Sequence, residues 1–313
     1  MTFHINANLS QEAEWLGVRS LPVPVRAKVG AFAATLAALA PPDDDVIVWT
    51  LAAVGADRLP ALPNWTPPSV RAGAPRDANL VWADPAAKAV NDRRFALELA
   101  TSLGCALPGA RVITTIDELD AIATATAPWV CKALWTSAGR DRCYGDGITF
   151  PPELRAYATK LLERGPVVFE PWMSRICDVA VCGVVGDTID VDPPHGLLSS
   201  VRGGFHGIDL ATTNLEIAEH DVLVMIAERA GLALQQAGYR GPFGVDAFVY
   251  HDGDRRRLHP LCEINARYTF GHVARALGRR LGISRVGFDH RPPSGATVLV
   301  QPTKLDTTMV WVA

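Results

Sequence analysis

The chain has 313 residues, of which 49% are hydrophobic and 20% are charged, an ordinary balance for a globular protein. This length suits two domains, or one domain with a smaller subdomain. The formal net charge of −3 gives no electrostatic reason to expect binding to nucleic acid or to an anionic membrane.

The sequence favours a reduced, cytoplasmic protein. Six cysteines are scattered along the chain without a C-x-x-C pair. The N-terminal stretch MTFHINANLSQEAEW lacks the basic and apolar regions of a signal peptide. The sequence also contains no run of about 18 apolar residues, so we expect no membrane span.

The first ninety residues are expected to form an α/β unit. Residues 26–39 are rich in alanine and carry apolar residues at helical spacing, which predicts a helix. A buried strand is expected over residues 46–51 and a short one over 80–82. Residues 57–78 hold five of the 23 prolines and are expected to form a long surface excursion.

The middle of the chain alternates predicted helices and strands. Helices are expected over 93–103, from Thr115 onward, and over 153–164. Strands are expected over 129–134, 167–170 and 179–185, the last pairing across Gly186-Asp187 with residues up to 189. The stretch TSAGRDRCYGDG after residue 134 is expected to be a polar loop.

The last third is expected to contain one mobile loop, two helices and strand pairs. The loop covers residues 190–214, which are rich in Gly, Pro, Ser and His. A helix over 217–237 carries a predicted apolar stripe, formed by Val222, Met225, Ile226, Ala230 and Leu234. A hairpin over 242–265, a helix over 273–281 and strand-like segments at 297–300 and 309–312 follow.

Polar side chains alternate along the segment LHPLCEINARYTFGH, residues 258–272. If this segment is a strand, Glu263, Asn265 and Arg267 lie on one face, because side chains repeat with a period of two. Carboxylate and amide oxygens are ligands of hard cations such as Mg²⁺. The arginine suits a carboxylate or a phosphate. The segment therefore predicts a charged site.

Five features in order carry a resemblance to a known family. They are Lys132 on a strand, the small-residue loop 136–142, the strand-end sequence EPWM at 170–173, Asp246 on a strand, and Glu263-x-Asn265. With these features, residues 91–281 resemble the ATP-grasp superfamily of carboxylate–amine and carboxylate–thiol ligases. The resemblance implies an α/β (α+β) fold, in which a pre-ATP-grasp domain precedes a two-lobed ATP-grasp domain.

The resemblance implies the following domain boundaries. The pre-ATP-grasp domain would cover residues 1–90 and the ATP-grasp domain residues 91–290, with its small lobe over about 105–172. A strand-like tail would cover residues 291–313.

The resemblance also assigns residues to the phosphates of ATP. Lys132 would neutralise the α- and β-phosphates, and Arg93 would supply a second cation where relatives usually carry a lysine. The loop that contains Ser137 and Gly139 would fold over the phosphates with its backbone N–H groups.

Other residues would hold the nucleoside and the metal. Glu170 would accept from the exocyclic amine of adenine, Asp178 would hold the ribose hydroxyls, and Trp172 and Met173 would supply apolar contact. The resemblance places Mg²⁺, with Mn²⁺ as an alternative, on Asp246, Glu263 and Asn265. Arg267 and Arg202 would act in catalysis, on the acceptor carboxylate or the transferred phosphoryl group.

The function implied is an ATP- and Mg²⁺-dependent ligase that joins a small-molecule carboxylate to an amine through an acyl phosphate. The alternatives are a kinase or thiol ligase on the same scaffold, or a nucleotide-binding protein without turnover. A homodimer is left open. Purely structural interpretations also exist, since Lys132 could extend to solvent from its strand and Glu263 with Asn265 could form a solvated face.

Overall fold

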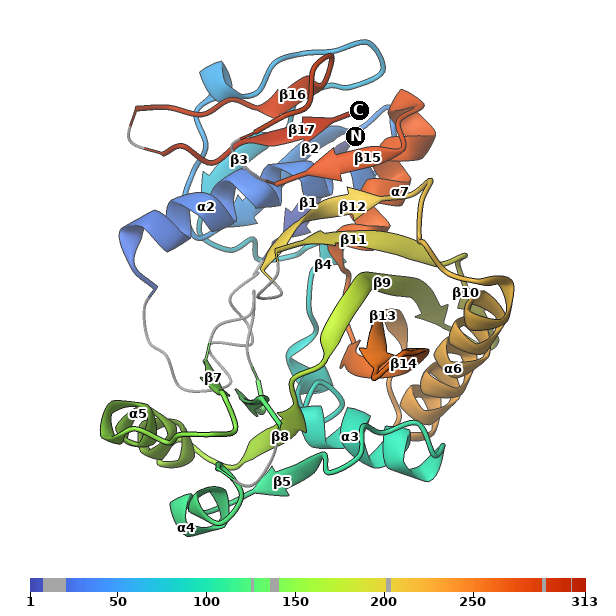
Figure 1. Ribbon diagram of the computed structural model, residues 1–313. Helices are drawn as coiled ribbons and strands as arrows, with labels where there is room; N and C mark the ends of the chain where they lie inside the picture. The colour runs from blue at the N-terminus through green and yellow to red at the C-terminus, as the bar shows by residue number, and fades with distance from the viewer. Residues whose placement is uncertain (8–20, 125–126, 136–140, 201–203, 289–290, 305) are drawn as a thin grey trace. The chain divides into compact units, whose positions relative to one another are not determined.

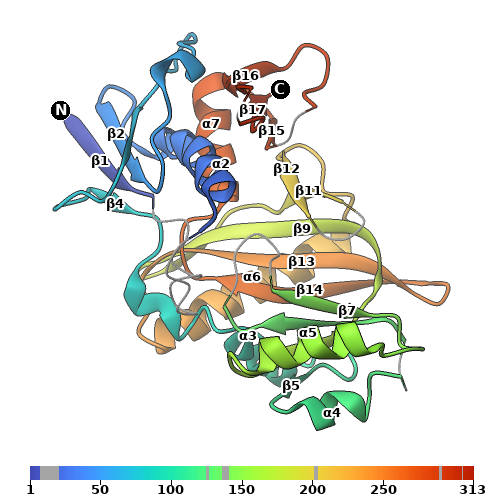
Figure 2. The ribbon, with the colours of Figure 1, turned by 90° about the vertical axis from the view of Figure 1, so that its left-hand side faces the viewer.

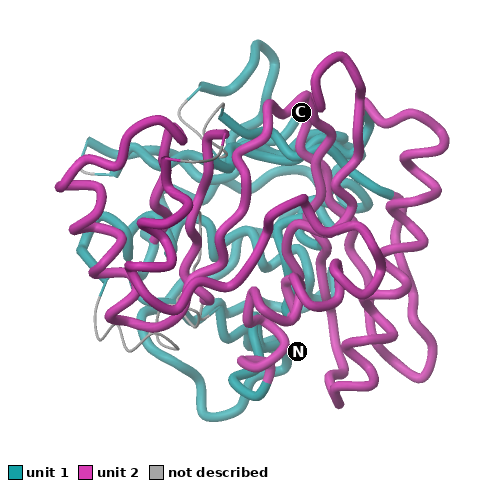
Figure 3. Tube along the Cα trace, turned by 60° about the horizontal axis from the view of Figure 1, so that its bottom comes forward, with its two compact units in different colours: residues 1–86, 194–213, 267–313 teal, residues 87–193, 214–266 magenta. Residues whose placement is uncertain are grey.

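The computed structural model describes residues 1–7, 21–124, 127–135, 141–200, 204–288, 291–304 and 306–313. The chain divides into two compact units (Figure 3). Unit 1 contains residues 1–86, 194–213 and 267–313, and unit 2 contains residues 87–193 and 214–266. Each unit draws on separated stretches of chain, whereas the segments 1–90, 91–290 and 291–313 expected from the sequence are consecutive.

Unit 1 begins with a parallel sheet in the order β3-β2-β1-β4. Its strands are β1 (Thr2–Asn6), β2 (Asp45–Thr50), β3 (Ser69–Ala72) and β4 (Leu80–Val81). The predicted strands at 46–51 and 80–82 are confirmed. The excursion expected over 57–78 is wrong in part, because it contains β3. Only Val70 of this strand is buried, so the sequence shows no alternation there.

The helix predicted over 26–39 is α2 (Val23–Ala34), continued by the 3₁₀ helix η1 (Thr35–Leu39). It starts earlier than expected because Pro22 and Pro24 fit a helix start. Short 3₁₀ turns follow at η2 (Ala56–Arg58) and η3 (Pro85–Lys88).

The rest of unit 1 is an antiparallel series in the order β11-β12-β15-β17-β16. Its elements are β11 (His195–Ser199), β12 (Phe205–Asp209), α7 (Phe270–Leu281), β15 (Arg285–Gly287), β16 (Thr297–Val300) and β17 (Val310–Val312). The strand pair predicted in the tail is confirmed.

The mobile loop predicted over residues 190–214 is wrong, because β11 and β12 form a hairpin there. Glycines inside these strands hide the pattern from the sequence. A Cβ at Gly207 would lie 2.4 Å from the backbone oxygen of Val286, so the close approach of β15 requires glycine at this position.

Unit 2 contains a sheet in the order β14-β13-β9, with β10 paired to β9. Its strands are β9 (Ser174–Val185), β10 (Ile189–Val191), β13 (Gly241–Asp252) and β14 (Arg255–Asn265), so the predicted hairpin is confirmed. One face packs against α6 (Ile217–Gln236) (Figure 2). The predicted stripe on α6 is partly wrong, since Val222 and Met225 are exposed and Leu223 and Ala227 are buried. The buried face is rotated by about one residue.

A second antiparallel sheet in unit 2 has the order β5-β8-β6-β7. Its strands are β5 (Arg111–Ile113), β6 (Trp129–Ala133), β7 (Arg142–Gly145) and β8 (Val167–Pro171), of which β5, β7 and β8 are labelled in Figure 1. The helices of this unit before residue 200 are α3 (Arg93–Ser102), α4 (Ile116–Asp120) and α5 (Pro152–Leu162). The polar loop predicted after residue 134 is wrong in part, because it contains β7. No helix among the described residues is long and apolar enough to cross a membrane.

Candidate active site

One face of the β13–β14 hairpin carries the polar residues that the sequence predicts for a metal. Asp246 on β13 lies directly opposite Glu263 on β14, so both carboxylates share a face, and Asn265 follows two residues later. The Asn265 Nδ2 donates to Asp246 Oδ2 at 3.2 Å. The alternate residues Val245 and Ile264 belong to the apolar cluster around α6. The hairpin therefore separates a polar face from a packed one.

A bulge in β14 sets this register. Asp246 pairs with Glu263, but Phe248, two residues away, pairs with His259, so residues 260–262 lie opposite a single residue of β13. Pro260 has no N–H to give to a ladder and is tolerated at such a position. Within the bulge, Leu261 joins the apolar cluster around α6 and the Cys262 Sγ lies 3.7 Å from the Lys132 Nζ.

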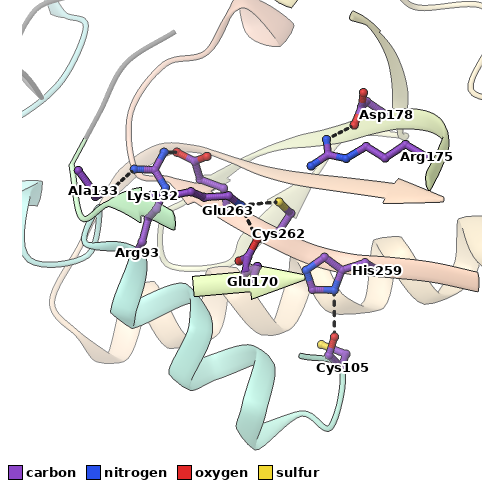
Figure 4. Close-up of polar contacts among 10 residues, drawn as sticks. All are labelled: Arg93, Cys105, Lys132, Ala133, Glu170, Arg175, Asp178, His259, Cys262 and Glu263. Atoms are coloured by element: carbon purple, nitrogen blue, oxygen red, sulfur yellow. Dashed lines mark hydrogen bonds and ion pairs between the residues drawn. The ribbon is translucent and has the colours of Figure 1, made fainter. Parts of the chain in front are cut away.

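Arg93 links helix α3 to Glu263. Asp92 caps this helix by accepting from the backbone N–H of Arg94 at 2.8 Å. The adjacent Arg93 side chain is 6% exposed and donates to Glu263 Oε1 at 2.8 Å and to the Ala133 carbonyl oxygen at 2.6 Å (Figure 4). The cation assigned to this helix start therefore contacts a proposed metal ligand.

Lys132 and Glu170 form a buried ion pair. They come from the adjacent strands β6 and β8, and the Lys132 Nζ lies 2.5 Å from Glu170 Oε2. Burial alone would raise the pKa of Glu170, but the charge of Lys132 and the hydrogen bond to it outweigh burial and lower this pKa. Lys132 thus points into the protein, and the interpretation in which it extends to solvent is wrong.

Arg142 is a cation of this site that the sequence did not indicate. It lies directly opposite Lys132 in the β6–β7 ladder, and like charges placed opposite each other on one face are destabilising. Burial would lower the pKa of Arg142, but attraction to Glu263 and a hydrogen bond to Tyr144 raise it. Arg142 could have been located only by recognising the short strand β7, which lies within a polar stretch of the sequence.

The other residues assigned to the nucleoside by the resemblance lie near Phe248. Arg175 donates to Asp178 Oδ1 at 2.5 Å, and its guanidinium lies 4.1 Å from the Phe248 ring centre and 5.1 Å from that of Trp172. Met173 packs on a small apolar cluster that contains Leu107, Phe248 and Tyr250. Asp178 is therefore already paired with a cation.

His259 was also missed by the sequence reasoning, because Pro260 interrupts the alternation of β14 immediately after it. It is 4% exposed, and its Nδ1 lies 3.0 Å from the Cys105 carbonyl oxygen. Its ring meets the Phe248 ring edge-on at 5.0 Å. Burial and the charges of Lys132 and Arg175 lower its pKa to about 4, although Glu170 acts in the opposite direction.

The remaining predicted residues are not described together with this site. Arg267 belongs to unit 1, where its NH1 donates to the Tyr268 carbonyl oxygen at 3.3 Å and its guanidinium lies 6.0 Å from the Trp82 ring centre. Arg202, Ser137 and Gly139 lie outside the described residues. Their roles remain predictions.

The donor set on the hairpin fits Mg²⁺. Asp246, Glu263 and Asn265 present two carboxylates and one amide on one sheet face. Mg²⁺ is usually held by one or two carboxylates together with substrate phosphates and water. The described residues contain no group of three or more His, Cys, Asp or Glu side chains placed to hold a metal. This arrangement therefore suits a hard ion that takes part of its shell from a substrate.

Solved structures share this fold at low sequence identity. Phosphoribosylamine–glycine ligase from Thermotoga maritima is 14% identical, with a TM-score of 0.56 over 100% of this chain and 90% of that one. N5-carboxyaminoimidazole ribonucleotide synthetase from Thermus thermophilus is 12% identical, with a TM-score of 0.56 over 100% and 93%. An ADP complex of N5-carboxyaminoimidazole ribonucleotide synthetase is 12% identical, with a TM-score of 0.51 over 90% and 75%.

No protein-family model matches the chain, and no curated protein matches its sequence. The likeness therefore concerns the fold. It agrees with the order of elements in both units and with the fold expected from Lys132, Glu170, Asp246 and the Glu263-x-Asn265 pair. The chain has the ATP-grasp fold.

Proposed function

We propose that this protein is an ATP- and Mg²⁺-dependent ligase that joins a carboxylate to an amine. The observation that carries the proposal is the pairing of Asp246 with Glu263 on one sheet face, with Arg93 hydrogen-bonded to Glu263 and Arg142 attracted to it. Paired carboxylates next to cations suit a metal–polyphosphate group. The carboxylates can bind the metal ion and the cations can bind the phosphates, so each charge has an opposite partner. The solved ligases with this fold, one of them an ADP complex, support the assignment.

The proposed chemistry has two steps. A carboxylate oxygen of the acceptor attacks the γ-phosphorus of ATP, the bond to ADP breaks, and an acyl phosphate forms. The amine nitrogen then attacks the acyl carbon, phosphate leaves, and the nitrogen loses a proton as the C–N bond forms. Such transfer depends mainly on positioning and charge neutralisation.

The residues of unit 2 would divide this work. Asp246, Glu263 and Asn265 would hold Mg²⁺, which neutralises the β- and γ-phosphates when bound. Arg93 and Arg142 would release part of their attraction to Glu263 and take phosphate oxygens instead. Lys132 would hold its charge beside Glu170, and Glu170 would face the nucleobase. Arg93 and Arg142 would each exchange one anionic partner for another and Lys132 would keep Glu170, so no cation is left without a counter-charge.

Calorimetry of ATP binding tests the metal site. We expect wild type to bind ATP tightly only with Mg²⁺, and Glu263→Ala to lose that metal dependence and at least about 10-fold in affinity. The matched control is Glu153→Ala, which removes an exposed carboxylate from α5 in the same unit. Equal, metal-independent affinity in wild type and Glu263→Ala would contradict the assignment.

Product analysis separates the proposal from its alternatives. Incubation with mixed carboxylates and amines should release ADP and phosphate together with an amide. A phosphorylated product would indicate a kinase, and a thioester would indicate a thiol ligase. Tight ATP binding with no hydrolysis across a broad panel would indicate a nucleotide-binding protein without turnover. The alternative without turnover is worth testing because two of the proposed site cations already have anionic partners: Lys132 is paired with Glu170, and Arg93 with Glu263.

A further inference from the structure

The inner face of the β11–β12 hairpin in unit 1 packs against helix α7. Leu197 of β11 lies directly opposite Ile208 of β12. Ile208 belongs to the apolar cluster that contains Val273 and Leu277 of α7, and Leu197 packs against that cluster. Side chains alternate along a strand, so His195, two residues before Leu197, points to the same face. The hairpin therefore presents His195 to the helix, at the end of an apolar face.

The His195 ring is buried on this face, and one of its nitrogens lacks a partner. The residue is 1% exposed, and its Nδ1 has no hydrogen-bond partner among the described residues. The neighbouring positions of the same face, Leu197 and Ile208, carry apolar side chains that need no partner. A buried imidazole nitrogen without a partner is costly, so its presence is understandable when a bound group supplies one.

The charged neighbours of His195 come from α7. Arg275 and His272 both disfavour a proton on its ring, and together with burial, the largest cause, they lower the pKa of His195 to about 3. His272 and Arg275 are three positions apart on the helix, so they share one of its faces. All three residues belong to unit 1. Three basic side chains from a strand and a helix thus lie together.

The hydrogen bond of His272 determines which of its nitrogens donates. Its Nδ1 accepts from the backbone N–H of Thr269 at 3.0 Å, as part of the cap of α7. The proton of the neutral ring therefore sits on Nε2. The guanidinium of Arg275 carries donors only, and a neutral His195 can donate from Nδ1. The cluster is therefore suited to a group that offers several acceptors and a negative charge.

We propose that His195, His272 and Arg275 form a site in unit 1 that binds an oxyanion, namely a carboxylate or phosphate group of a small molecule. Oxygen atoms of this group accept from His195 Nδ1 and are attracted by the charge of Arg275. A metal cation does not suit the same cluster, because Arg275 repels it. The site goes beyond the proposed function, in which the residues that hold Mg²⁺ and ATP belong to unit 2.

Calorimetric titration of the nucleotide-free protein tests this site. Potassium phosphate and potassium acetate are each compared with potassium chloride at equal ionic strength, and we expect wild type to bind at least one of the two oxyanions saturably. His195→Leu, which matches the apolar side chains of its face, and Arg275→Gln should each weaken that binding at least about 10-fold. The matched controls are His206→Leu, at an exposed histidine of β12, and Arg279→Gln, at an exposed arginine of α7, and both should bind as wild type does.

The cations of unit 2 are a second place where phosphate can bind, so Arg142→Met is titrated in parallel. This variant should keep the oxyanion affinity of wild type. Loss of binding in Arg142→Met, with retention in His195→Leu and Arg275→Gln, would assign the anion to unit 2 and overturn the inference. Tighter binding of phosphate than of acetate would support a phosphate-bearing ligand, and the reverse order would support a carboxylate-bearing one.

Wild type alone can also overturn the inference, so it does not depend on the variants folding. If wild type binds neither phosphate nor acetate saturably beyond the chloride control, the cluster takes no oxyanion and the inference is wrong. The proposed function would still stand, because its own test is the Mg²⁺-dependent binding of ATP. Equal binding by wild type and by folded His195→Leu and Arg275→Gln would indicate an adventitious ion only, which would overturn the inference as well.

Discussion

Two groups of buried charges in this protein are built differently. In unit 1, Arg58 donates from Nε to the Gln301 carbonyl oxygen at 2.6 Å, from NH1 to Asp306 at 2.8 Å and from NH2 to the Thr308 carbonyl oxygen at 3.0 Å. Each nitrogen of its guanidinium has an acceptor. In unit 2, the Nε atoms of Arg93, Arg142 and Arg175 are buried without a hydrogen-bond partner, and Arg142 lies opposite another cation.

The difference separates a structural charge from charges kept for a ligand. An arginine whose donors all have acceptors within the protein holds its chain segments together and has no donor left for a substrate. Unsatisfied buried donors and opposed cations cost stability, so their presence is understandable when a bound anion completes them. The following predictions test this contrast, in order of decreasing effect.

Replacing Arg58 should produce the largest loss of stability. Arg58→Met leaves Asp306 half-buried without its counter-charge and two carbonyl oxygens without donors, which should cost about 3–5 kcal/mol of the free energy of unfolding. Chemical denaturation measures it. Arg71→Met, at an exposed arginine of β3 in the same unit, is the matched control and should change the free energy by less than about 0.5 kcal/mol. Similar losses of stability in both variants would show that the hydrogen bonds and ion pair of Arg58 do not stabilise the fold more than an exposed arginine does.

Acid should destabilise the protein through His259. Its folded-state pKa is about 4, whereas an unfolded histidine titrates near 6.5, so the unfolded chain binds a proton first as the pH falls. The free energy of unfolding should therefore fall between about pH 6.5 and pH 4, by about 3 kcal/mol from this residue. His195, with a pKa of about 3, acts in the same direction.

Denaturation at pH 7.0, 5.5 and 4.5 measures this dependence. His259→Phe should remove part of the pH slope, and His195→Phe should remove another part. Identical slopes in wild type and both variants would mean that neither ring is kept neutral in the folded protein.

Replacing Arg142 should have the smallest effect, and on ligand binding rather than on folding. Arg142→Met removes a cation near Glu263 and relieves its repulsion with Lys132, so stability should stay within about 0.5 kcal/mol. ATP affinity should fall about 10-fold, or about 1.4 kcal/mol, and Arg142→Lys should recover part of it. Arg155→Met, at the exposed ion pair with Asp120 in the same unit, serves as the control in calorimetry. A large loss of stability with unchanged affinity would place Arg142 in the structural group.

The sequence allowed the polar face of the hairpin to be predicted, because alternation along β14 is a local property. Glu263 and Asn265 follow that alternation and Asp246 lies opposite Glu263, whereas Arg267, which was expected on the same face, lies beyond the end of β14. Arg142 and His259 could not be predicted in the same way. The first lies on a strand that the sequence presents as a polar loop, and the second is separated from Glu263 by a bulge that no period of two anticipates.

The interaction partners of the charged side chains could not be predicted from the sequence either. The ion pair of Lys132 with Glu170 joins residues 38 positions apart, and the contact of Arg93 with Glu263 joins residues 170 positions apart. Each depends on how distant segments pack in space, which no local pattern in the sequence determines. The β11–β12 hairpin was missed because its glycines are required by neighbouring backbone rather than by any local preference.

The bulge at residues 260–262 has a consequence for the behaviour of the protein in solution. β14 lies at the end of the strand order of its sheet, and a regular strand in that place offers a template to strands of other chains. Pro260 withholds a donor from such a template, and the bulge breaks the straight run of backbone groups around it. The irregularity that sets Glu263 opposite Asp246 thus also discourages aggregation through this edge.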